Sequence, residues 1–548
     1  MHDAAALEAP NRKPPFKPVA FVRANFPTLA DSSLAIASAL LLVVSFPDFN
    51  LWWLAWIGLV PLMVVIGRTP MVGRAFILGW LWGTIFFYGT CWWLTYPMIH
   101  YGRLPAWLAY PLLLLPVMLA ALFPGMACFL ISRLISRFGP AAMFTAPVTW
   151  VSFEWLRYAV TGQLWNALGY SQAFHPFLIQ NARWGGVYVV SFLLLTTNAS
   201  VTFAFMRPGL KVLLPALIPI VFVVLVVVIG ASPIFQIPPR GQLMPVVAVQ
   251  PNVPMEGADD SAATTQLLNR HLELSKQGLR ELPDDVGSVL LVIWPESPMN
   301  FSYSRDPHLK EIVGSFTRSY SRRQHGFLLL NSLETTPNGS EYNSALTIND
   351  EGRIVAQYDK IRLMPFGEYV PLPQWLPGAS SVRGIVGEFT PGSSYTLMPL
   401  GAFRVGVFIC IEAAHPGIAR SFANAGADVL INISNDGYLG PTPVMQQHLA
   451  NAVFRAVEND RPLVRVTNSG ISALIWPTGE IRESTSPFEP TVRSWVIAAG
   501  ASGKTFYTRH GDVFVYACAL ISLGILSASF MTKRSVPGAI ATGSLLKP

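Results

Sequence analysis

Eight long apolar runs limit what this chain of 548 residues can fold into. About 20 consecutive apolar residues cross a bilayer as a helix. Hydrophobic residues make up 52% of the chain and charged residues only 13%, about half the charged share of a soluble domain. This excludes a disordered chain and a soluble enzyme, and predicts a protein embedded in a membrane. The runs are 29–47, 51–67, 75–95, 105–132, 141–158, 187–206, 212–232 and 513–531.

The charges are distributed unevenly along the chain. Residues 1–240 carry 14 Lys and Arg against 5 Asp and Glu, whereas residues 241–508 carry 20 against 25. Basic residues mark the cytoplasmic loops of membrane proteins, and here every second junction between runs is basic. We therefore expect both chain ends in the cytoplasm and the polar part in the periplasm of a bacterium. The basic residues at these junctions are Arg12, Lys13, Lys17, Arg23, Arg68, Arg74, Arg133, Arg137, Arg207, Lys211, Lys533 and Arg534.

These patterns divide the chain into five parts. The run from residue 29 has no small-residue cleavage site just after it, so we interpret it as an anchor and not as a removed signal peptide. The polar part contains no cluster of basic residues interleaved with aromatic ones, so no nucleic-acid partner is expected. The predicted parts are a cytoplasmic tail 1–28, a membrane domain 29–232 with seven spans, a periplasmic domain 233–508, an eighth span 509–532 and a second cytoplasmic tail 533–548.

The polar domain has the pattern of strands buried between helices. Short β-rich apolar runs alternate with helical stretches, which predicts an α/β domain whose sheet order the sequence leaves open. Turn signals at 349–352 and 477–480 predict two hairpins. The predicted strands are 246–249, 289–294, 327–330, 405–409, 429–433 and 463–467, and the predicted helices are 264–278, 418–425 and 444–458.

Cys410 is the only cysteine outside the apolar runs. An oxidising compartment normally pairs thiols, so a lone periplasmic cysteine needs an explanation. Cys410 directly follows an apolar strand, and an elbow from strand to helix would expose its sulfur beside backbone N–H groups that face an oxyanion. From this residue alone, a buried and inert core cysteine is an equally good interpretation.

Two charged residues could assist such a thiol. Glu296 ends an apolar strand, where a carboxylate is either a general base or, more commonly, a solvated loop residue. Lys360 precedes a long, proline-rich apolar segment, and a lysine there is usually solvated. Its pairing with Glu368 could be a surface ion pair that contributes little to stability. Each residue alone is a weak signal.

The order of these residues resembles the nitrilase superfamily. WPE ends at Glu296, YDKIRLMPFGEYVP contains Lys360 and Glu368, and CxE runs from Cys410 to Glu412. Members of this superfamily use a Glu–Lys–Cys triad on an αββα sandwich. From about residue 29 to 531 the chain is similar to the membrane-bound branch, the apolipoprotein N-acyltransferases. The further segments that carry this resemblance are 154–157, 165–172, 432–437, 447–448, 455–458, 461–462 and 467–470.

The resemblance implies a polytopic α-helical membrane domain of about eight spans and a nitrilase-like αββα sandwich. It makes Cys410 the nucleophile, Glu296 the general base and Lys360 the electrostatic stabiliser, with Glu368 and Glu412 in support, and it implies no cofactor and no metal. These roles suit acyl transfer, because only a thiolate attacks, Glu296 can take its proton, and an ammonium stabilises both the thiolate and the oxyanion.

The chain departs from the family pattern at two places. Ile411 follows the nucleophile where an aromatic residue is expected, and Pro254, Met255 and Glu256 stand where some relatives have a tryptophan. Both departures concern the placement of acyl chains or loops and leave the triad unchanged. The segment 363–392 is predicted to form an apolar arm over the site that dips into the bilayer surface, because Phe366 and Trp375 lie there among prolines.

The family also implies the substrates. A phospholipid, typically phosphatidylethanolamine, gives its sn-1 acyl chain through a cysteine thioester to the α-amine of the N-terminal diacylglyceryl cysteine of lipoproteins, the last step of their maturation at the bacterial inner membrane. The alternative is a membrane-tethered, nitrilase-like amidohydrolase with water as acceptor, which would not need eight spans. A transporter should bury more charges in its spans than Glu154 and Arg157. A structural scaffold would have no use for the ordered triad.

Overall fold

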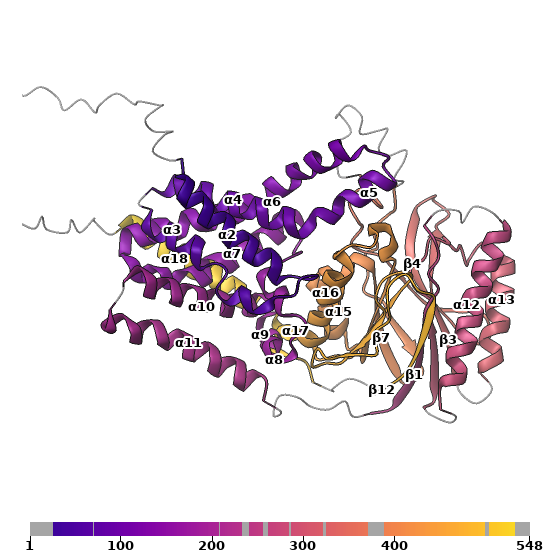
Figure 1. Cartoon of the computed structure of the whole chain (residues 1–548). Helices are drawn as coiled ribbons and strands as arrows, with labels where there is room; N and C mark the ends of the chain where they lie inside the picture. The colour runs from indigo at the N-terminus through magenta and orange to yellow at the C-terminus, as the bar shows by residue number, and fades with distance from the viewer. Residues whose placement is uncertain are drawn as a thin grey trace, which may run out of the picture.

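The computed structural model describes residues 26–69, 71–207, 209–232, 241–255, 261–283, 287–321, 325–370, 388–498 and 503–531. Long helices form one part of the molecule, and two β-sheets with their own helices form the other (Figure 1). Residues 371–387 of the predicted arm, Trp375 among them, lie outside the described residues, as do Glu256, residues 1–25 of the first predicted tail and the whole of the second.

Five helical stretches of the described chain are long and apolar enough to cross a membrane. They are Val72–His100, which begins with α4 (Val72–Cys91), α6 (Ala106–Phe138), α10 (Val187–Met206), α11 (Leu210–Gly230) and α18 (Val513–Met531).

The other three predicted spans form shorter helices, so the count of eight is not confirmed and stays a prediction. These helices are α2 (Leu29–Ser45), α3 (Val60–Arg68) and α7 (Ala146–Thr161). Proline favours the first turn of a helix, and Pro61 and Pro147 place the starts of α3 and α7 after short 3₁₀ turns. Both helices therefore begin later than the apolar runs that predict them.

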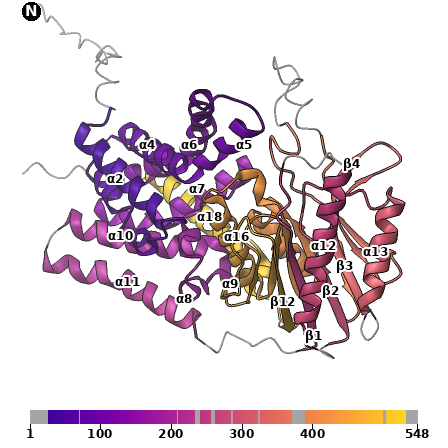
Figure 2. The same ribbon diagram turned by 45° about the vertical axis from the view of Figure 1, so that its right-hand side comes forward.

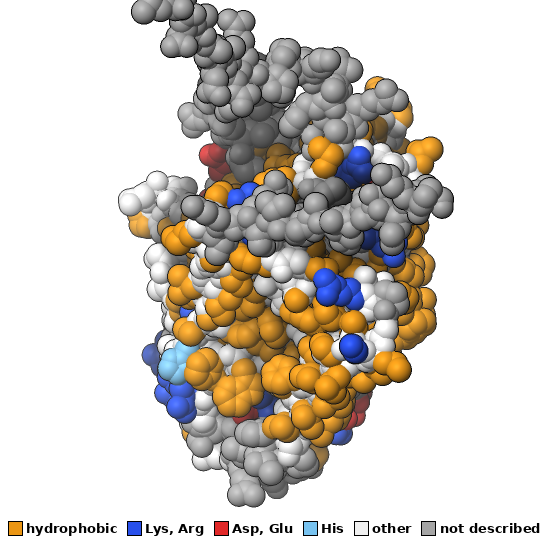
Figure 3. All heavy atoms as spheres, turned by 90° about the vertical axis from the view of Figure 1, so that its left-hand side faces the viewer, with side chains coloured by type: hydrophobic (Ala, Val, Ile, Leu, Met, Phe, Trp, Pro, Cys, Tyr) orange, Lys and Arg blue, Asp and Glu red, His pale blue; other side chains and the backbone are white. Residues whose placement is uncertain are grey.

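Small residues let the membrane helices approach closely. A Cβ atom at Gly79 of α4 would lie 2.6 Å from the Sγ atom of Cys128, and one at Gly83 would lie 2.6 Å from Pro124, both on α6. Such small-residue contacts are typical of helix packing in lipid. Seen from the end of the helices that lies away from the sheets, hydrophobic side chains cover much of the surface that the described residues form, with several Lys and Arg side chains among them (Figure 3).

The polar part is a sandwich of two six-stranded sheets, which confirms the predicted αββα fold. In each sheet three neighbouring strands run parallel, β1 to β3 in one and β7 to β9 in the other, and helices follow the first two strands of each set. The first sheet has the order β12 (Thr491–Ala498), β1 (Leu243–Gln250), β2 (Val289–Ile293), β3 (His325–Thr335), β4 (Glu341–Ile348) and β5 (Ile354–Asp359). The second has the order β11 (Ile481–Arg482), β10 (Ala473–Ile475), β9 (Leu463–Thr467), β8 (Val429–Ser434), β7 (Phe403–Ile409) and β6 (Leu397–Leu400).

Helices cover the outer faces of both sheets. The helices α12 (Ser261–Glu281) and α13 (Pro307–Tyr320) lie on the face that points away from the membrane helices. On the other side, α15 (Pro416–Ala425) and α16 (Val444–Asn459) lie between the second sheet and the membrane helices (Figure 1), and Figure 2 shows α16 there from a second direction. Almost every residue of α16 is buried, because this helix has protein on both sides.

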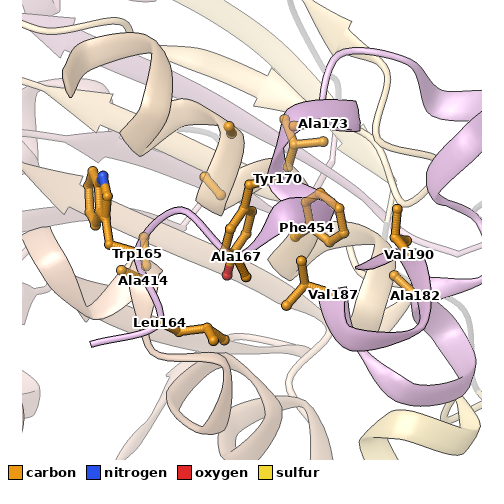
Figure 4. Packing of buried hydrophobic residues seen from close by; sticks show 14 of the residues in the cluster. Leu164, Trp165, Ala167, Tyr170, Ala173, Ala182, Val187, Val190, Ala414 and Phe454 are labelled. Atoms are coloured by element: carbon orange, nitrogen blue, oxygen red, sulfur yellow. The ribbon is translucent and has the colours of Figure 1, made fainter. Parts of the chain in front are cut away.

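The two parts of the molecule meet in a closely packed interface. Residues 164–190 of the helical part lie against α16 and the turn that follows β7 (Figure 4). The ring of Tyr170 meets that of Phe454 edge to face, with centroids 5.0 Å apart. Arg455 donates to the hydroxyl of Tyr170 at 3.2 Å. Polar and apolar contacts therefore fix the sandwich on the membrane helices.

Candidate active site

The predicted site residues follow the ends of strands from both sheets. Glu296 comes shortly after β2, Lys360 directly after β5, and Cys410 directly after β7. The backbone N–H of Asn435, just after β8, donates to the carboxylate of Glu296 at 3.0 Å. Glu296, from the first sheet, therefore reaches the strand end beside Cys410 in the second, and the structure brings the three residues to one place.

Lys360 is a buried ammonium held between two carboxylates. Its Nζ donates to Glu368 at 2.8 Å and to Glu296 at 3.4 Å, and the residue is only 1% exposed. Burial alone lowers the pKa of Lys360, but the charges of Glu296 and Glu368 outweigh this effect and hold the pKa well above its usual value. Lys360 is therefore a fixed cation and not the solvated surface residue that its sequence position alone favoured.

Asn343 holds the two carboxylates in place. Its Nδ2 donates to Glu296 at 2.9 Å and to Glu368 at 2.7 Å, and its own oxygen accepts from Asn331 at 2.7 Å. Sequence reasoning missed this residue. Asn343 lies on β4, 47 positions from Glu296, and it belongs to none of the three motifs, so nothing local marked it.

Glu412 has a different position from the other acids. Its carboxylate accepts from the backbone N–H groups of Ile361 at 2.8 Å, Arg362 at 3.0 Å and Ile409 at 2.8 Å. Burial raises the pKa of Glu412, and the N–H groups that donate to it partly offset that rise. Glu412 thus joins the loop after Lys360 to the strand that ends at Cys410.

Cys410 occupies a strained elbow between β7 and a 3₁₀ turn (Cys410–Ala414). Its φ angle of 52° lies in the left-handed region, which costs a non-glycine residue about 1–3 kcal/mol and persists only where the surroundings fix it. Two side chains donate to its carbonyl oxygen, Nε2 of His448 at 2.9 Å and Nδ2 of Asn432 at 3.4 Å. The predicted elbow is present.

The electrostatics favour a protonated thiol at rest. Burial raises the pKa of Cys410, and the negative charges of Glu296, Asp436 and Glu368 raise it further, while Lys360 lowers it. A thiol whose pKa is raised in this way would need a general base to take its proton before it could act as a nucleophile.

The structure describes some of the residues behind the remaining expectations. Ile411 packs partly buried against the core, and the sulfur of Met255 accepts from Asn435 at 3.1 Å. Phe366 is 49% exposed and has a φ angle of 59°; it is a described residue of the predicted arm. Among the residues that the structure describes, no group of three or more His, Cys, Asp or Glu side chains is placed to hold a metal ion.

Two known protein families match separate parts of the chain. The apolipoprotein N-acyltransferase N-terminal domain matches residues 38–200, and the carbon-nitrogen hydrolase family matches residues 246–500. An amidase variant from Nesterenkonia sp. AN1, whose structure shows covalent addition at its active-site cysteine, covers 51% of this chain and 98% of its own with 18% identity and a TM-score of 0.35.

Two relatives match most of the chain. The apolipoprotein N-acyltransferase of Geobacter metallireducens is 32% identical over 92% of this chain and 96% of its own length. That of Allorhizobium ampelinum is 32% identical over 74% of this chain and 76% of its own. With this identity over nearly its whole length, a helical membrane part and a nitrilase-like sandwich, the chain belongs to the apolipoprotein N-acyltransferase family.

Proposed function

We propose that this acyltransferase moves the sn-1 acyl chain of a phospholipid to the α-amine of the diacylglyceryl cysteine of a lipoprotein, through a thioester on Cys410. The observation that supports it most is the buried Lys360 ammonium, held between Glu296 and Glu368 beside a thiol on a strained elbow. A cation fixed at this place stabilises the oxyanion that forms during acyl transfer. The relatives, which are named apolipoprotein N-acyltransferase, support an apolipoprotein as the acceptor and an amine nitrogen as the atom that takes the acyl group.

In the first half of the reaction, Glu296 takes the proton of Cys410 as Sγ attacks the ester carbonyl carbon. Lys360 stabilises the oxyanion of the tetrahedral intermediate. The carbon–oxygen bond then breaks, and Glu296 returns the proton to the departing lysophospholipid oxygen. The products are a thioester on Cys410 and a lysophospholipid.

In the second half, the α-amine of the lipoprotein attacks the thioester carbon. Glu296 takes a proton from the amine, the carbon–sulfur bond breaks, and the proton passes to Sγ. The amide is released and the thiol is restored. The lysophospholipid can leave before the lipoprotein binds, so two bulky lipids need not occupy the site together.

The orientation in the membrane belongs to the same proposal. Arg74 at the start of α4 lies 4.0 Å from Asp31 near the start of α2, and Arg133 near the end of α6 donates to Ser529 near the end of α18 at 3.3 Å. These helix ends lie away from the sheets (Figure 1). By the positive-inside rule this end faces the cytoplasm.

With its basic helix ends in the cytoplasm, the protein would lie in the bacterial inner membrane with the sandwich in the periplasm. Residues 1–28 and 533–548 are cytoplasmic tails, 29–232 and 509–532 are the membrane part, and 233–508 are the catalytic domain. Phosphatidylethanolamine is the proposed acyl donor, at the outer leaflet of this membrane.

Labelling of the acyl-enzyme tests the proposal. The wild-type protein is incubated in vesicles with acyl-labelled phosphatidylethanolamine and no acceptor, and we expect bound label that neutral hydroxylamine releases. Cys410→Ala should bind none, and Glu296→Gln should load slowly if at all. Loss of the Lys360 contact in Lys360→Met should slow loading by about a hundredfold to a thousandfold.

The matched control changes the other three cysteines. Cys91→Ala, Cys128→Ala and Cys518→Ala together should load like the wild type. Label that remains on Cys410→Ala, or acyl transfer at the wild-type rate without this thiol, would overturn the mechanism. If the enzyme loads but passes the acyl group to water and not to a diacylglyceryl peptide, it is the amidohydrolase-like alternative, which the relatives do not favour.

A further inference from the structure

Gln447 of α16 forms all of its side-chain hydrogen bonds with the membrane part. Its oxygen accepts from Nε1 of Trp165 at 2.8 Å and Nε1 of Trp93 at 3.2 Å. Its nitrogen donates to the carbonyls of Thr90 at 2.9 Å and Pro47 at 3.3 Å. A glutamine amide has two donor hydrogens and an oxygen with two lone pairs, so the membrane part satisfies the whole group.

The next residue, His448, faces the nucleophile. Its Nε2 lies 2.9 Å from the carbonyl oxygen of Cys410, and its Nδ1 lies 3.0 Å from a carboxylate oxygen of Asp436. Asp436 in turn is held by Arg465 at 2.6 Å. The ring of Trp165 lies against that of His448, with centroids 5.7 Å apart. Trp165 thus contacts both Gln447 and His448.

The bond from His448 acts on the strained residue of the site. Cys410 has a left-handed backbone, and such a conformation persists only when the surrounding structure fixes it. His448 forms the shorter of the two side-chain bonds to its carbonyl oxygen. If His448 moves, the elbow can relax and the sulfur turns away from Glu296 and Lys360.

The residues around His448 are closely packed, so a displacement of Trp165 or Gln447 would also displace His448. Trp165 is 8% exposed, and His448 and Gln447 are buried. Leu164, Trp165 and Ala167 line the same contact, with Ala414 of the turn after Cys410 close by (Figure 4). Close-packed interiors transmit displacements to their neighbours.

We propose that Trp165, a residue of the membrane part, is a positioning residue for the nucleophile and acts through Gln447 and His448 on the backbone of Cys410. This inference rests on the proposed role of Cys410. The contact between the sandwich and the membrane helices is then required to keep Cys410 in its reactive conformation. Cys410 reacts at its full rate only when the two parts of the protein are packed together beside the membrane that holds the lipid substrates.

The test removes single hydrogen bonds from the full-length protein. Trp165→Phe keeps a ring against His448 and loses the N–H to Gln447. Trp80→Phe is the matched control, because Nε1 of Trp80 donates to Met118 at 3.0 Å within the membrane helices. Two rates are measured: iodoacetamide alkylation, quantified on the Cys410 peptide by mass spectrometry, and acyl-enzyme loading. Thermal unfolding confirms that each variant is folded.

We expect Trp165→Phe to slow both rates by about fivefold to tenfold, the effect of one lost buried hydrogen bond, with an unfolding temperature like that of Trp80→Phe. Trp80→Phe should match the wild type in both rates. Rates in Trp165→Phe equal to those of the wild type would overturn the proposal. A slower Trp165→Phe whose loss is matched by Trp80→Phe would also overturn it, because the effect would then be general loosening of the membrane part.

A double-mutant cycle with His448 tests the path of the coupling. His448→Leu removes the donor to Cys410, and His448→Gln supplies another and should restore part of the rate. In the His448→Leu background, Trp165→Phe should add less than about twofold, because coupled residues are non-additive. If the rate losses of the two single variants multiply in the double variant, the two residues act independently, and this would contradict a coupling from Trp165 through His448 to Cys410. The alkylation rate needs no acyl transfer, so it reports on this link even if Cys410→Ala shows that the proposed function is wrong.

Discussion

The hydroxyl of Tyr358 donates to both carboxylate oxygens of Glu412, at 2.9 and 3.0 Å. Tyr358 belongs to β5 of one sheet, and Glu412 to the turn after β7 of the other. The same carboxylate accepts from the backbone of Ile361 and Ile409. Glu412 therefore fixes the loop that carries Lys360 relative to the elbow that carries Cys410, and it does so across the two sheets.

Replacing Glu412 by Gln should slow acyl-enzyme loading by tenfold or more. The amide would place an NH₂ group against a backbone N–H of Ile361 or Ile409, and a buried donor left without a partner costs about 1–3 kcal/mol. Single-turnover labelling measures the rate, and thermal unfolding measures the loss of stability. The control is Glu273→Gln, which breaks only an exposed pair with Lys276 and should change neither quantity. Loading at the wild-type rate in Glu412→Gln would refute this role.

Asn343→Leu should slow loading by about tenfold to a hundredfold, because hydrogen bonds to charged groups contribute about 1.5–3 kcal/mol. Without this donor, Glu296 and Glu368 repel each other and lose their fixed positions beside Lys360. Gln357→Leu is the matched control. It removes an amide donor to Asp359, two residues further along the same strand β5, and should leave the loading rate unchanged. If both variants load equally fast, Asn343 does not order the site.

The buried His271 should make the sandwich less stable in acid. Burial lowers the pKa of His271 to about 4, from 6.5. Between these pH values the unfolded chain binds a proton that the folded protein does not, so stability falls as the pH drops from 6.5 towards 4. The contribution of this one group is at most about 3 kcal/mol.

Thermal unfolding of the solubilised protein between pH 7 and pH 4 measures this dependence. His271→Leu should make the decline with falling pH shallower. His308→Gln, a change at an exposed histidine of α13, should leave it unchanged. An identical slope in His271→Leu and the wild type would show that protonation of His271 does not limit stability in acid.

The basic residues at the ends of the membrane helices predict on which side of the membrane each part of the protein lies. Alkaline phosphatase, which is active only in the periplasm, should be active when fused after Gly500 and inactive when fused after Lys533. The reverse result would place the sandwich in the cytoplasm, away from the outer leaflet where the proposed acceptor would be modified.

Local sequence patterns were sufficient for several features of this protein. Short apolar runs predicted the positions of the six parallel strands, closely for 405–409 against the observed Phe403–Ile409, but too short for 327–330 against the observed His325–Thr335. A fully buried strand needs side chains that are apolar on both faces, and this is visible without any partner. The number of spans was less accessible, because proline can start a helix part of the way along an apolar run, as at Pro61 and Pro147.

The sequence by itself determined that the chain is a membrane protein with an α/β domain, that its motifs follow the order of the Glu–Lys–Cys family, and that Cys410 ends a strand. Only the tertiary structure decided that Lys360 is a buried cation between Glu296 and Glu368, that Asn343 bridges these two acids, and that Gln447 and His448 connect the membrane part to Cys410. Hydropathy and turn signals act over a few neighbouring residues. These contacts join residues far apart in the chain, and they exist only because the order of the strands and the docking of α16 bring their side chains within hydrogen-bonding distance.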